Sequence, residues 1–453
     1  MKKSRFISKS EELRYQKINE LKVYKQRSRK SKRFVQHSPL NDTFYFNYGK
    51  RFQSALSKLF ISKSFIDKKH VNQNIIVPKN CTFQDNFDET ILLIKRIASS
   101  LVFTFRGITI DFSKCNTTNL APMFLVQILV FENQEFIQLY NLGSYTQINR
   151  ELNIIPSKSL KVNKILNALN LIKGIPNKDI PDDDLYLPLG IKIGAKARRL
   201  IYENKKGAIC SYITKFVNES LMGVKYSLNP TGRFYLDSII AEILGNAEDH
   251  SHINRWYVNG VSFRTSEEGT IIVELNLCII NFGYSVYEGF EENKDLNTDI
   301  YQKLNDAYEK YRENNNKLGF VGQSLPKESM FTIFALQEGI SRLKYQNQSR
   351  GNGTMNFIRA FFELGVLGDE FPKYKPVLSI FSGKTSLNCN NKYKPIKKDG
   401  LWILALNNER NLVGRQDSEC IRYSYEYFPG TILHVSVFLN EDFFKKLSET
   451  NER

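Results

Sequence analysis

A helix followed by a β-hairpin in the second half of the chain constrains the fold more than any other sequence feature. In the segment 235–251, YLDSIIAEILGNAEDHS, apolar residues recur with the spacing of an amphipathic helix. The stretches Trp256–Phe263 and Thr270–Ile280 are rich in β-branched and aromatic residues, which is typical of strands, and the turn residues 266–269 separate them. Alternating helices and strands predict an α/β fold. Of the 453 residues, 42% are hydrophobic, which is enough for two packed cores.

Three polar side chains of this predicted helix recur at intervals of four residues. Glu242, Asn246 and His250 would lie along one face, because four residues are slightly more than one helical turn. The amide oxygen of Asn246 is a suitable ligand for Mg²⁺, a cation that prefers oxygen and keeps several waters. The carboxylate of Glu242 could orient or deprotonate a water beside a phosphate. The alternative is an ordinary surface helix, in which the pattern Glu-x-x-x-Asn is common.

Glycines at three later positions would let a ligand approach the backbone. The segment 281–283, NFG, follows the second predicted strand, where a polar residue and a glycine leave room for close contact. The segment 349–354, SRGNGT, precedes the apolar helical run 355–364, so backbone N–H groups at the helix start would attract an anion. Gly430 and Thr431 precede a further predicted strand, Ile432–Leu439.

Taken together, these segments resemble the motifs of the GHKL, or Bergerat-fold, ATPases. The segment 242–250, EILGNAEDH, is similar to the N box E-x-x-x-N-A-x-x-H, and most similar to that of anti-sigma-factor serine kinases. The segments 281–283, 350–354 and 430–431 stand in the order and at the approximate spacing of the G1 box, the G2 box and a late Gly-Thr element. The resemblance covers about half of the chain. It implies an ATP-binding domain over residues 220–440 that is a two-layer α/β sandwich, preceded by a smaller α/β domain and a basic N-terminal tail.

The resemblance also implies a role for each matching residue. Glu242 would be the catalytic residue that positions or activates the attacking group, and Asn246 would ligate the metal. The residues expected to bind the nucleotide are Asn246, Asn281, Gly283, Arg350, Gly351, Gly353, Thr354 and Thr431. Of these, Gly283 and Thr431 would lie at the adenine, and Gly351, Gly353 and Thr354 at the phosphates. The implied cofactors are ATP and Mg²⁺. The implied activity is slow hydrolysis or phosphotransfer in regulation, by an ATPase or a serine/threonine kinase-like enzyme.

Two positions depart from the family pattern. The family carries an aspartate that accepts a hydrogen bond from the adenine amino group, and Asn281 stands in its place. An amide oxygen can accept the same bond, but a charge-assisted bond is about twice as strong as a neutral one. Ser285 stands where the second glycine of the G1 box is expected. The departures motivate a second hypothesis, in which the domain is a nucleotide-binding scaffold or sensor without turnover.

The segment 284–348 separates the two glycine boxes. In the family this segment is an ATP lid, which implies a mobile element that closes over the phosphates. It contains the charged run Glu291–Lys317 and the amphipathic stretch Glu328–Leu343. For the charged run, the favoured interpretation is a solvent-exposed helical insertion.

A smaller α/β domain is predicted over residues 80–175. Val102–Phe112 alternates like a strand, Asn119–Phe131 has helical spacing, and Glu135–Tyr140 is predicted to be another strand. The outline of residues 108–121 is similar to a STAS domain, a family that partners anti-sigma kinases and can be phosphorylated on Ser or Thr in that loop. Thr117 and Thr118 stand near the matching place, and the alternative is an ordinary βα turn.

Positive charge is concentrated in the tail, residues 1–40. Residues 1–34 hold 13 Lys or Arg against three Glu, which accounts for +10 of the net charge of +17. Such a block attracts polyanions, so a third hypothesis is a nucleic-acid-binding protein led by the tail, without base-specific contacts. The alternative is a solvated, partly helical tail.

The remaining features concern compartment and partners. No stretch approaches the roughly 20 apolar residues that span a bilayer, and the first residues do not form a secretory signal. Six scattered cysteines without a C-x-x-C pair argue against a zinc site or a disulfide framework and fit a reducing compartment. We therefore expect a cytoplasmic protein without a membrane span. Besides ATP, we expect a protein partner or a second copy of the chain as a further partner.

Overall fold

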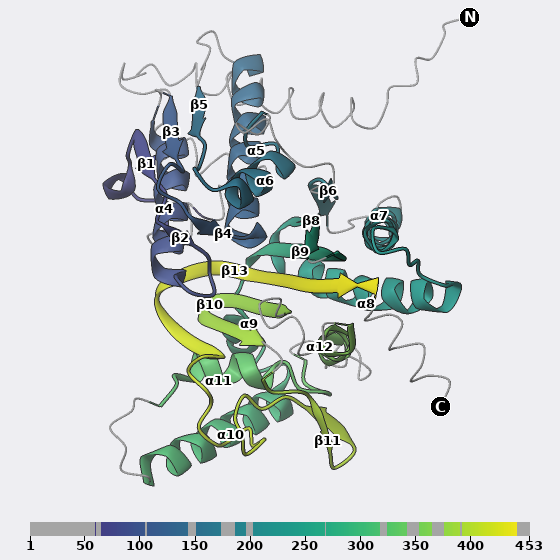
Figure 1. Cartoon of the computed structure of the whole chain (residues 1–453). Helices are drawn as coiled ribbons and strands as arrows, with labels where there is room; N and C mark the ends of the chain where they lie inside the picture. Colours follow the sequence, from purple (N-terminus) through teal and green to yellow (C-terminus); the bar gives the residue numbers. More distant parts are fainter. Residues whose placement is uncertain are drawn as a thin grey trace, which may run out of the picture.

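The longest strands of the chain form one antiparallel sheet, which lies at the centre of the computed structural model (Figure 1). The structure describes residues 59, 65–104, 107–143, 151–173, 186–195, 203–267, 269–317, 324–341, 353–364, 376–389 and 392–441. The strand order is β10-β13-β9-β8-β6, and β7 also pairs with β8. These strands are β6 (Tyr186–Pro188), β7 (Lys192–Ala195), β8 (Ser251–Glu267), β9 (Thr270–Gly283), β10 (Val377–Cys389) and β13 (Ile421–Asn440).

The predicted hairpin is confirmed and is longer than its sequence signal. β8 and β9 pair as far as Glu267 and Thr270, and Gly269 takes the positive φ of 82° that the tight turn requires. The predicted strand 432–439 is the second half of β13, which pairs with both β9 and β10. Each strand gains length because it has a long antiparallel partner on at least one side.

Helices cover one face of this sheet. α8 (Pro230–His250) contains the predicted helix, and α7 (Glu203–Met222) and α12 (Gly353–Leu364) pack on it. Apolar side chains of the three helices join those of the sheet in one core, through residues such as Ile213, Leu244 and Ile358. The expected helical insertion is present between β9 and α12, where the helices are α9 (Val286–Glu292), α10 (Thr298–Lys317) and α11 (Lys327–Phe334).

A unit formed by residues 65–173 covers the opposite face of the sheet. It has a parallel sheet in the order β1-β3-β5 and a short parallel pair, β2-β4. Its strands are β1 (Asn74–Ile76), β2 (Asn80–Cys81), β3 (Ile108–Asp111), β4 (Thr117–Thr118) and β5 (Leu152–Ile155). Its helices are η1 (Lys68–His70), α4 (Phe87–Phe103), α5 (Leu120–Gly143) and α6 (Leu160–Ala168).

One predicted strand differs from the structure. The strand predicted at Glu135–Tyr140 is wrong, because α5 continues through it and no proline or glycine lies between Pro122, in its first turn, and Gly143. Strand β7 completes the edge of the sheet beside Trp256. Thr117 is exposed, whereas Thr118 is buried and donates its hydroxyl to the Cys81 carbonyl at 2.8 Å. The basic tail lies outside the described residues.

The N-terminal unit and the sheet share one core. Leu93, Phe124 and other side chains of α4 and α5 pack with Tyr257, Ile280 and Phe282 of the sheet. Charge is buried at the same boundary. Arg255 of β8 contacts Glu132 and Glu135 of α5, at 2.9 Å each. Residues 65–173 therefore form a layer of the same folded body, with the sheet between two apolar faces.

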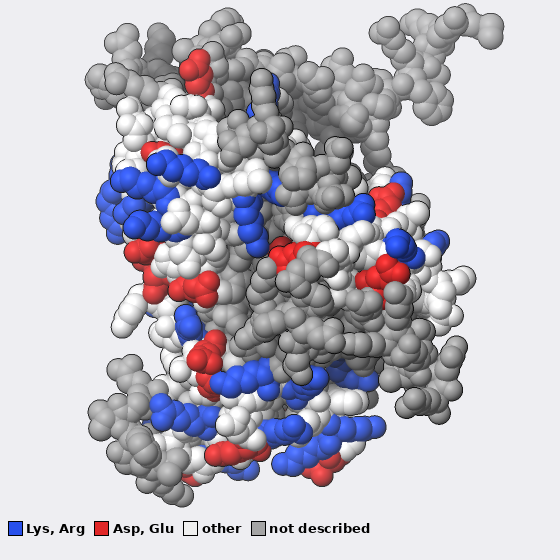
Figure 2. All heavy atoms as spheres, viewed as in Figure 1, with Lys and Arg blue, Asp and Glu red and all other residues white. Residues whose placement is uncertain are grey.

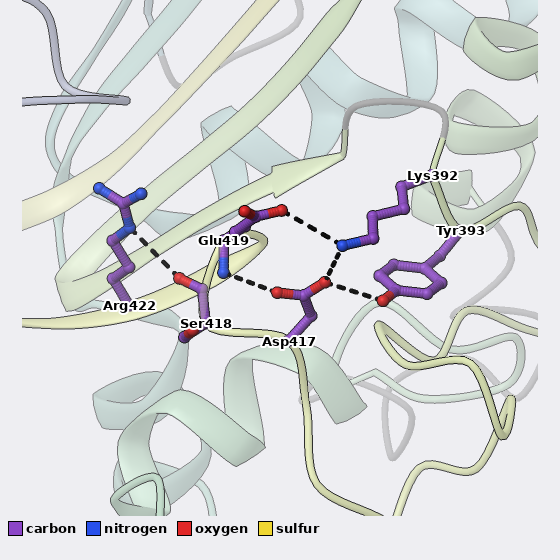
Figure 3. Close-up of polar contacts among 6 residues, drawn as sticks. All are labelled: Lys392, Tyr393, Asp417, Ser418, Glu419 and Arg422. Atoms are coloured by element: carbon purple, nitrogen blue, oxygen red, sulfur yellow. Dashed lines mark hydrogen bonds and ion pairs between the residues drawn. The ribbon is translucent and has the colours of Figure 1, made fainter.

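A long insertion between β10 and β13 carries the hairpin of β11 (Ile396–Lys398) and β12 (Leu401–Ile403). Asp417 fastens the two ends of the insertion, because its carboxylate accepts from Lys392 Nζ at 2.6 Å and from the Tyr393 hydroxyl at 2.8 Å (Figure 3). Glu419 adds a second carboxylate contact to Lys392 at 3.2 Å. The insertion is thus closed into a loop of fixed shape.

Charge of both signs is mixed on the face of the molecule that Figure 2 shows. Figure 2 shows Lys and Arg side chains gathered low on the face in view, over the region of α10 and β11. Lys397 and Lys398 of β11 are among the exposed basic residues there. In the described part of the chain, no helix is long and apolar enough to cross a membrane. All six cysteines are buried and free.

A buried polar network joins the N-terminal unit to β10 and β13. Asn119 donates to Gln84 Oε1 at 2.6 Å, which orients the Gln84 amide so that its nitrogen faces Ser379 at 3.0 Å and His434 Nδ1 at 3.2 Å. His434 Nε2 has no hydrogen-bond partner among the described residues. Burial lowers the pKa of His434 to about 4, because removal from water disfavours the charged imidazolium.

The environment of His434 predicts a loss of stability in mild acid. The folded pKa of about 4 lies below the ordinary 6.5, so the unfolded chain takes up this proton first as the pH falls. The free energy of unfolding should decline between those two values, by up to about 1.4 kcal/mol per pH unit from this residue. Urea unfolding of wild type and His434→Gln at pH 7 and pH 5 measures the difference. Equal pH dependence in the two proteins would contradict the prediction.

Candidate functional site

One cavity of about 420 Å³ lies between α8, α12, the helical insertion and the sheet. Six of the residues expected from the sequence line it, and they come from four separate elements. These are Glu242, Asn246, Asn281, Gly353, Thr354 and Thr431. The cavity therefore gathers most of the predicted site, although nothing in the local sequence brings these elements together.

α8 supplies the polar wall of the cavity. The helix begins at Pro230, where the Asn229 side chain caps it by accepting from Gly232 N at 2.7 Å. Its apolar stripe, which includes Ile243 and Leu244, is buried against the core. Asn246 lies beside that stripe and is half-buried, whereas Glu242 is exposed, and both side chains line the cavity.

The start of α12 touches this wall directly. A Cβ on Gly353 would lie 1.8 Å from Glu242 Cδ, so only glycine allows this approach. One turn further along α8, Asn246 Nδ2 lies 3.5 Å from Thr354 Oγ1. The acid and the amide of one helix thus face the backbone N–H groups at the beginning of another.

The carboxyl group of Glu242 has an altered proton affinity. Burial raises its pKa above the ordinary value, and a hydrogen bond from the Gly353 backbone N–H partly opposes this shift. A carboxylate with a raised pKa is a better proton acceptor than one with the ordinary value. The position is suited to a general base for a water in the cavity.

The sheet provides the floor of the cavity, and this floor is mostly apolar. Its lining residues are Ile279, Asn281, Ile380, Thr431 and Leu433. Asn281 is buried, accepts from Thr431 N at 2.9 Å and donates to the Ala247 carbonyl at 3.3 Å. The amide thereby ties β9 to both β13 and α8.

Several lining residues could not be expected from the motifs. Lys206 of α7 reaches the cavity and lies 3.7 Å from Glu248 Oε2, which places a positive charge beside the acidic wall. The helical insertion contributes Tyr284, Val286, Leu336 and Ile340. No local pattern marks Lys206, because its position depends on how α7 packs against α8.

Some predicted residues stand apart from this cavity or outside the described chain. Gly283 is at the end of β9, where it pairs with Ser251, and does not line the cavity. Arg350 and Gly351 lie outside the described residues. The same is true of residues 318–323 and 342–348 of the predicted lid, whereas α9 lines the cavity with Val286 and Phe290.

The β11–β12 hairpin braces two walls of the cavity. Trp402 exchanges two hydrogen bonds with Glu338, at 2.6 and 3.2 Å, and Leu404 exchanges two with Gln337, at 2.8 and 3.1 Å. The guanidinium of Arg359, on α12, stacks on the Trp402 ring at 4.0 Å. The segment after α11 and the helix α12 are therefore held by the same hairpin.

The residues present suit a cation that keeps most of its own water. Among the described residues, no group of three or more His, Cys, Asp or Glu could hold a metal by itself. Mg²⁺ needs no such cage, since it commonly binds one or two protein oxygens together with substrate phosphates. Asn246, whose amide nitrogen faces Thr354, has an amide oxygen that could serve as one such ligand.

Comparison of the chain with protein-family models, with curated proteins and with solved structures finds no match in any of the three.

The contact between Gly353 and Glu242 predicts that an alanine at position 353 is tolerated. In Gly353→Ala the new methyl group would collide with the mobile end of the Glu242 side chain, so the free energy of unfolding should stay within about 1 kcal/mol of wild type. In Gly194→Ala the methyl group would lie 1.8 Å from the buried Trp256 ring and should cost about 3 kcal/mol or more. Urea unfolding of both variants compares them. Equal losses would show that the wall at Glu242 is rigid.

Proposed function

We propose that the chain binds ATP together with Mg²⁺ in this cavity, as a GHKL-type domain with the Bergerat fold. The observation that carries the proposal is the meeting of Glu242 and Asn246 with Gly353 and Thr354 on one cavity. Asn246 and Thr354 are 108 residues apart in the chain. Their sequence motifs resemble the N box and the G2 box of the family, and their proximity is what a shared nucleotide site requires.

The division of the cavity into two ends supports a nucleotide as ligand. Charged and polar groups gather along α8 and the start of α12, whereas the floor on the sheet is mostly apolar. A nucleotide has the same division, with a flat base that prefers apolar surroundings and a charged phosphate chain. The volume of about 420 Å³ is in the range of small-molecule sites, which is about 300–1,000 Å³.

Several groups would hold the phosphates at the polar end. The Thr354 backbone N–H, in the first turn of α12, suits an anion because it has no partner within the helix, whereas the Gly353 N–H donates to Glu242. Lys206 supplies a positive charge across the cavity. Mg²⁺, when bound, would neutralise part of the phosphate charge, and Asn246 Oδ1 would be its protein ligand.

Glu242 would act on the attacking group. Its pKa is raised by burial, and its contact with the Gly353 backbone keeps it beside the expected phosphate position. In the proposed reaction this carboxylate orients a water or a hydroxyl and accepts its proton. The product would be ADP with phosphate, or a phosphorylated serine or threonine.

A regulatory role follows from what lies behind the floor. Thr431 and Leu433 of β13 line the cavity, while Ile432 packs with the N-terminal unit and His434 bonds to its Gln84. A shift of β13 on nucleotide binding would therefore change the contacts of Ile432 and His434 with the N-terminal unit. We propose that the N-terminal unit, or a protein bound to it, responds to whether the cavity holds a nucleotide.

Removing the proposed metal ligand tests the assignment. In Asn246→Ala the binding of an ATP analogue should weaken by at least about tenfold with Mg²⁺ present and change little in EDTA, because only the metal-dependent part is lost. Isothermal titration of the full chain measures both conditions. Asn314→Ala, at an exposed position on α10, is the matched control. Equal binding by wild type and Asn246→Ala would show that the site assignment is wrong.

A second candidate function is nucleotide binding without turnover, as a scaffold or sensor. The uncharged floor of the cavity favours binding without turnover. The Asn281 oxygen already accepts one hydrogen bond from Thr431 N, and the neutral amide would bind a base less strongly than a carboxylate would.

Turnover distinguishes the two functions. If the chain is an enzyme, Glu242→Gln should keep nucleotide binding and lower phosphate release by about 100-fold or more, since the neutral amide cannot accept the proton. Phosphate release from ATP, measured for wild type and variant, gives the answer. Binding without release in the wild type would identify a sensor.

A further inference from the structure

The floor of the cavity has few polar groups with which to read a base. Among the described lining residues, the five from the sheet include no ionisable side chain. The polar ones are Asn281 and Thr431, which lie opposite each other on β9 and β13. Whatever base rests on this floor is recognised by one amide and one hydroxyl.

The orientation of the Asn281 amide is fixed by the backbone around it. Its oxygen accepts from Thr431 N at 2.9 Å, and its nitrogen donates to the Ala247 carbonyl at 3.3 Å. Exchanging oxygen and nitrogen would set two acceptors against each other at Ala247 and two donors at Thr431. An amide oxygen accepts two hydrogen bonds and an amide nitrogen donates two. Asn281 therefore keeps one acceptor and one donor for a ligand.

The role of the Thr431 hydroxyl follows from the bonds of Ser382. Ser382 Oγ accepts from Val286 N at 2.8 Å and donates its single hydrogen to the Gly430 carbonyl at 3.2 Å. It also lies 3.0 Å from Thr431 Oγ1. With the hydrogen of Ser382 donated to the Gly430 carbonyl, Thr431 is the donor in this contact. Toward the cavity, the Thr431 oxygen then acts as an acceptor.

We propose that this site, if it binds ATP as argued above, takes guanine nucleotides as well as adenine nucleotides. The floor offers one donor and two acceptors. Guanine presents a carbonyl acceptor beside two N–H donors, and adenine presents an amino donor beside a ring acceptor. Both edges can be paired by the fixed amide, with Thr431 as an additional acceptor for guanine. A carboxylate at position 281 would offer acceptors alone and would repel the guanine carbonyl.

The wild-type protein provides the first test. Isothermal titration of the full chain with the β,γ-imido analogues of ATP and GTP, each with Mg²⁺, gives two dissociation constants without hydrolysis. We expect them to agree within about tenfold, a ratio smaller than an acceptor-only site would give. An ATP analogue that binds more than about tenfold tighter overturns this inference and leaves the ATP site standing. Binding of neither analogue overturns the proposed function and the inference together.

A substitution tests the amide itself. In Asn281→Asp the GTP analogue should lose at least about tenfold in affinity relative to the ATP analogue, because the donor is gone. Asn293→Asp is the control, since Asn293 also donates to a backbone carbonyl, of Gly289 at 2.8 Å, and does not line the cavity. An unchanged ratio in folded Asn281→Asp contradicts base recognition by the amide. Should burial of the new carboxylate prevent folding, the wild-type comparison decides alone.

Discussion

The structure depends on a sheet that is buried on both faces. Along β13, successive residues alternate between two environments: Thr431 and Leu433 face the cavity, and Ile432 and His434 face the N-terminal unit. β9 does the same with Ile279 and its neighbours. A shift of either strand by one residue would exchange the two sets, so the apolar pattern of both faces fixes the register. The position of every floor group in the cavity follows from that register.

The cavity is a meeting point, and each element brings a different kind of group to it. α8 supplies acid and amide, α12 supplies the backbone N–H groups of its first turn, and the sheet supplies an apolar floor with two neutral polar groups. The meeting is possible because Gly353 has no side chain where Glu242 passes. The β11–β12 hairpin then holds α12 and the end of α11 in place through Trp402. The proposed nucleotide site is therefore supported by packing far from its own residues.

The sequence predicted what local periodicity controls and missed what packing controls. The strand pattern of 270–280 and the helical face carrying Glu242 and Asn246 appear in the structure as expected. The same method assigned Glu135–Tyr140 to a strand, because six residues of mixed polarity do not reveal that a helix runs through them. Lys206 could not be found either, since its proximity to the cavity depends on the packing of two helices. The fixed orientation of Asn281 likewise depends on Ala247 and Thr431, distant in sequence from it and from each other.

The burial of the sheet on both sides has a practical consequence for dissecting this protein. A fragment beginning near residue 186 would keep the cavity but lose the layer that covers Tyr257, Ile280 and Phe282. It would expose a broad apolar surface and leave Arg255 without its two carboxylate partners. Both changes favour aggregation. We therefore expect that the fragment from about residue 186 does not fold stably alone. Biochemistry on it would require residues 65–173 as a co-expressed companion.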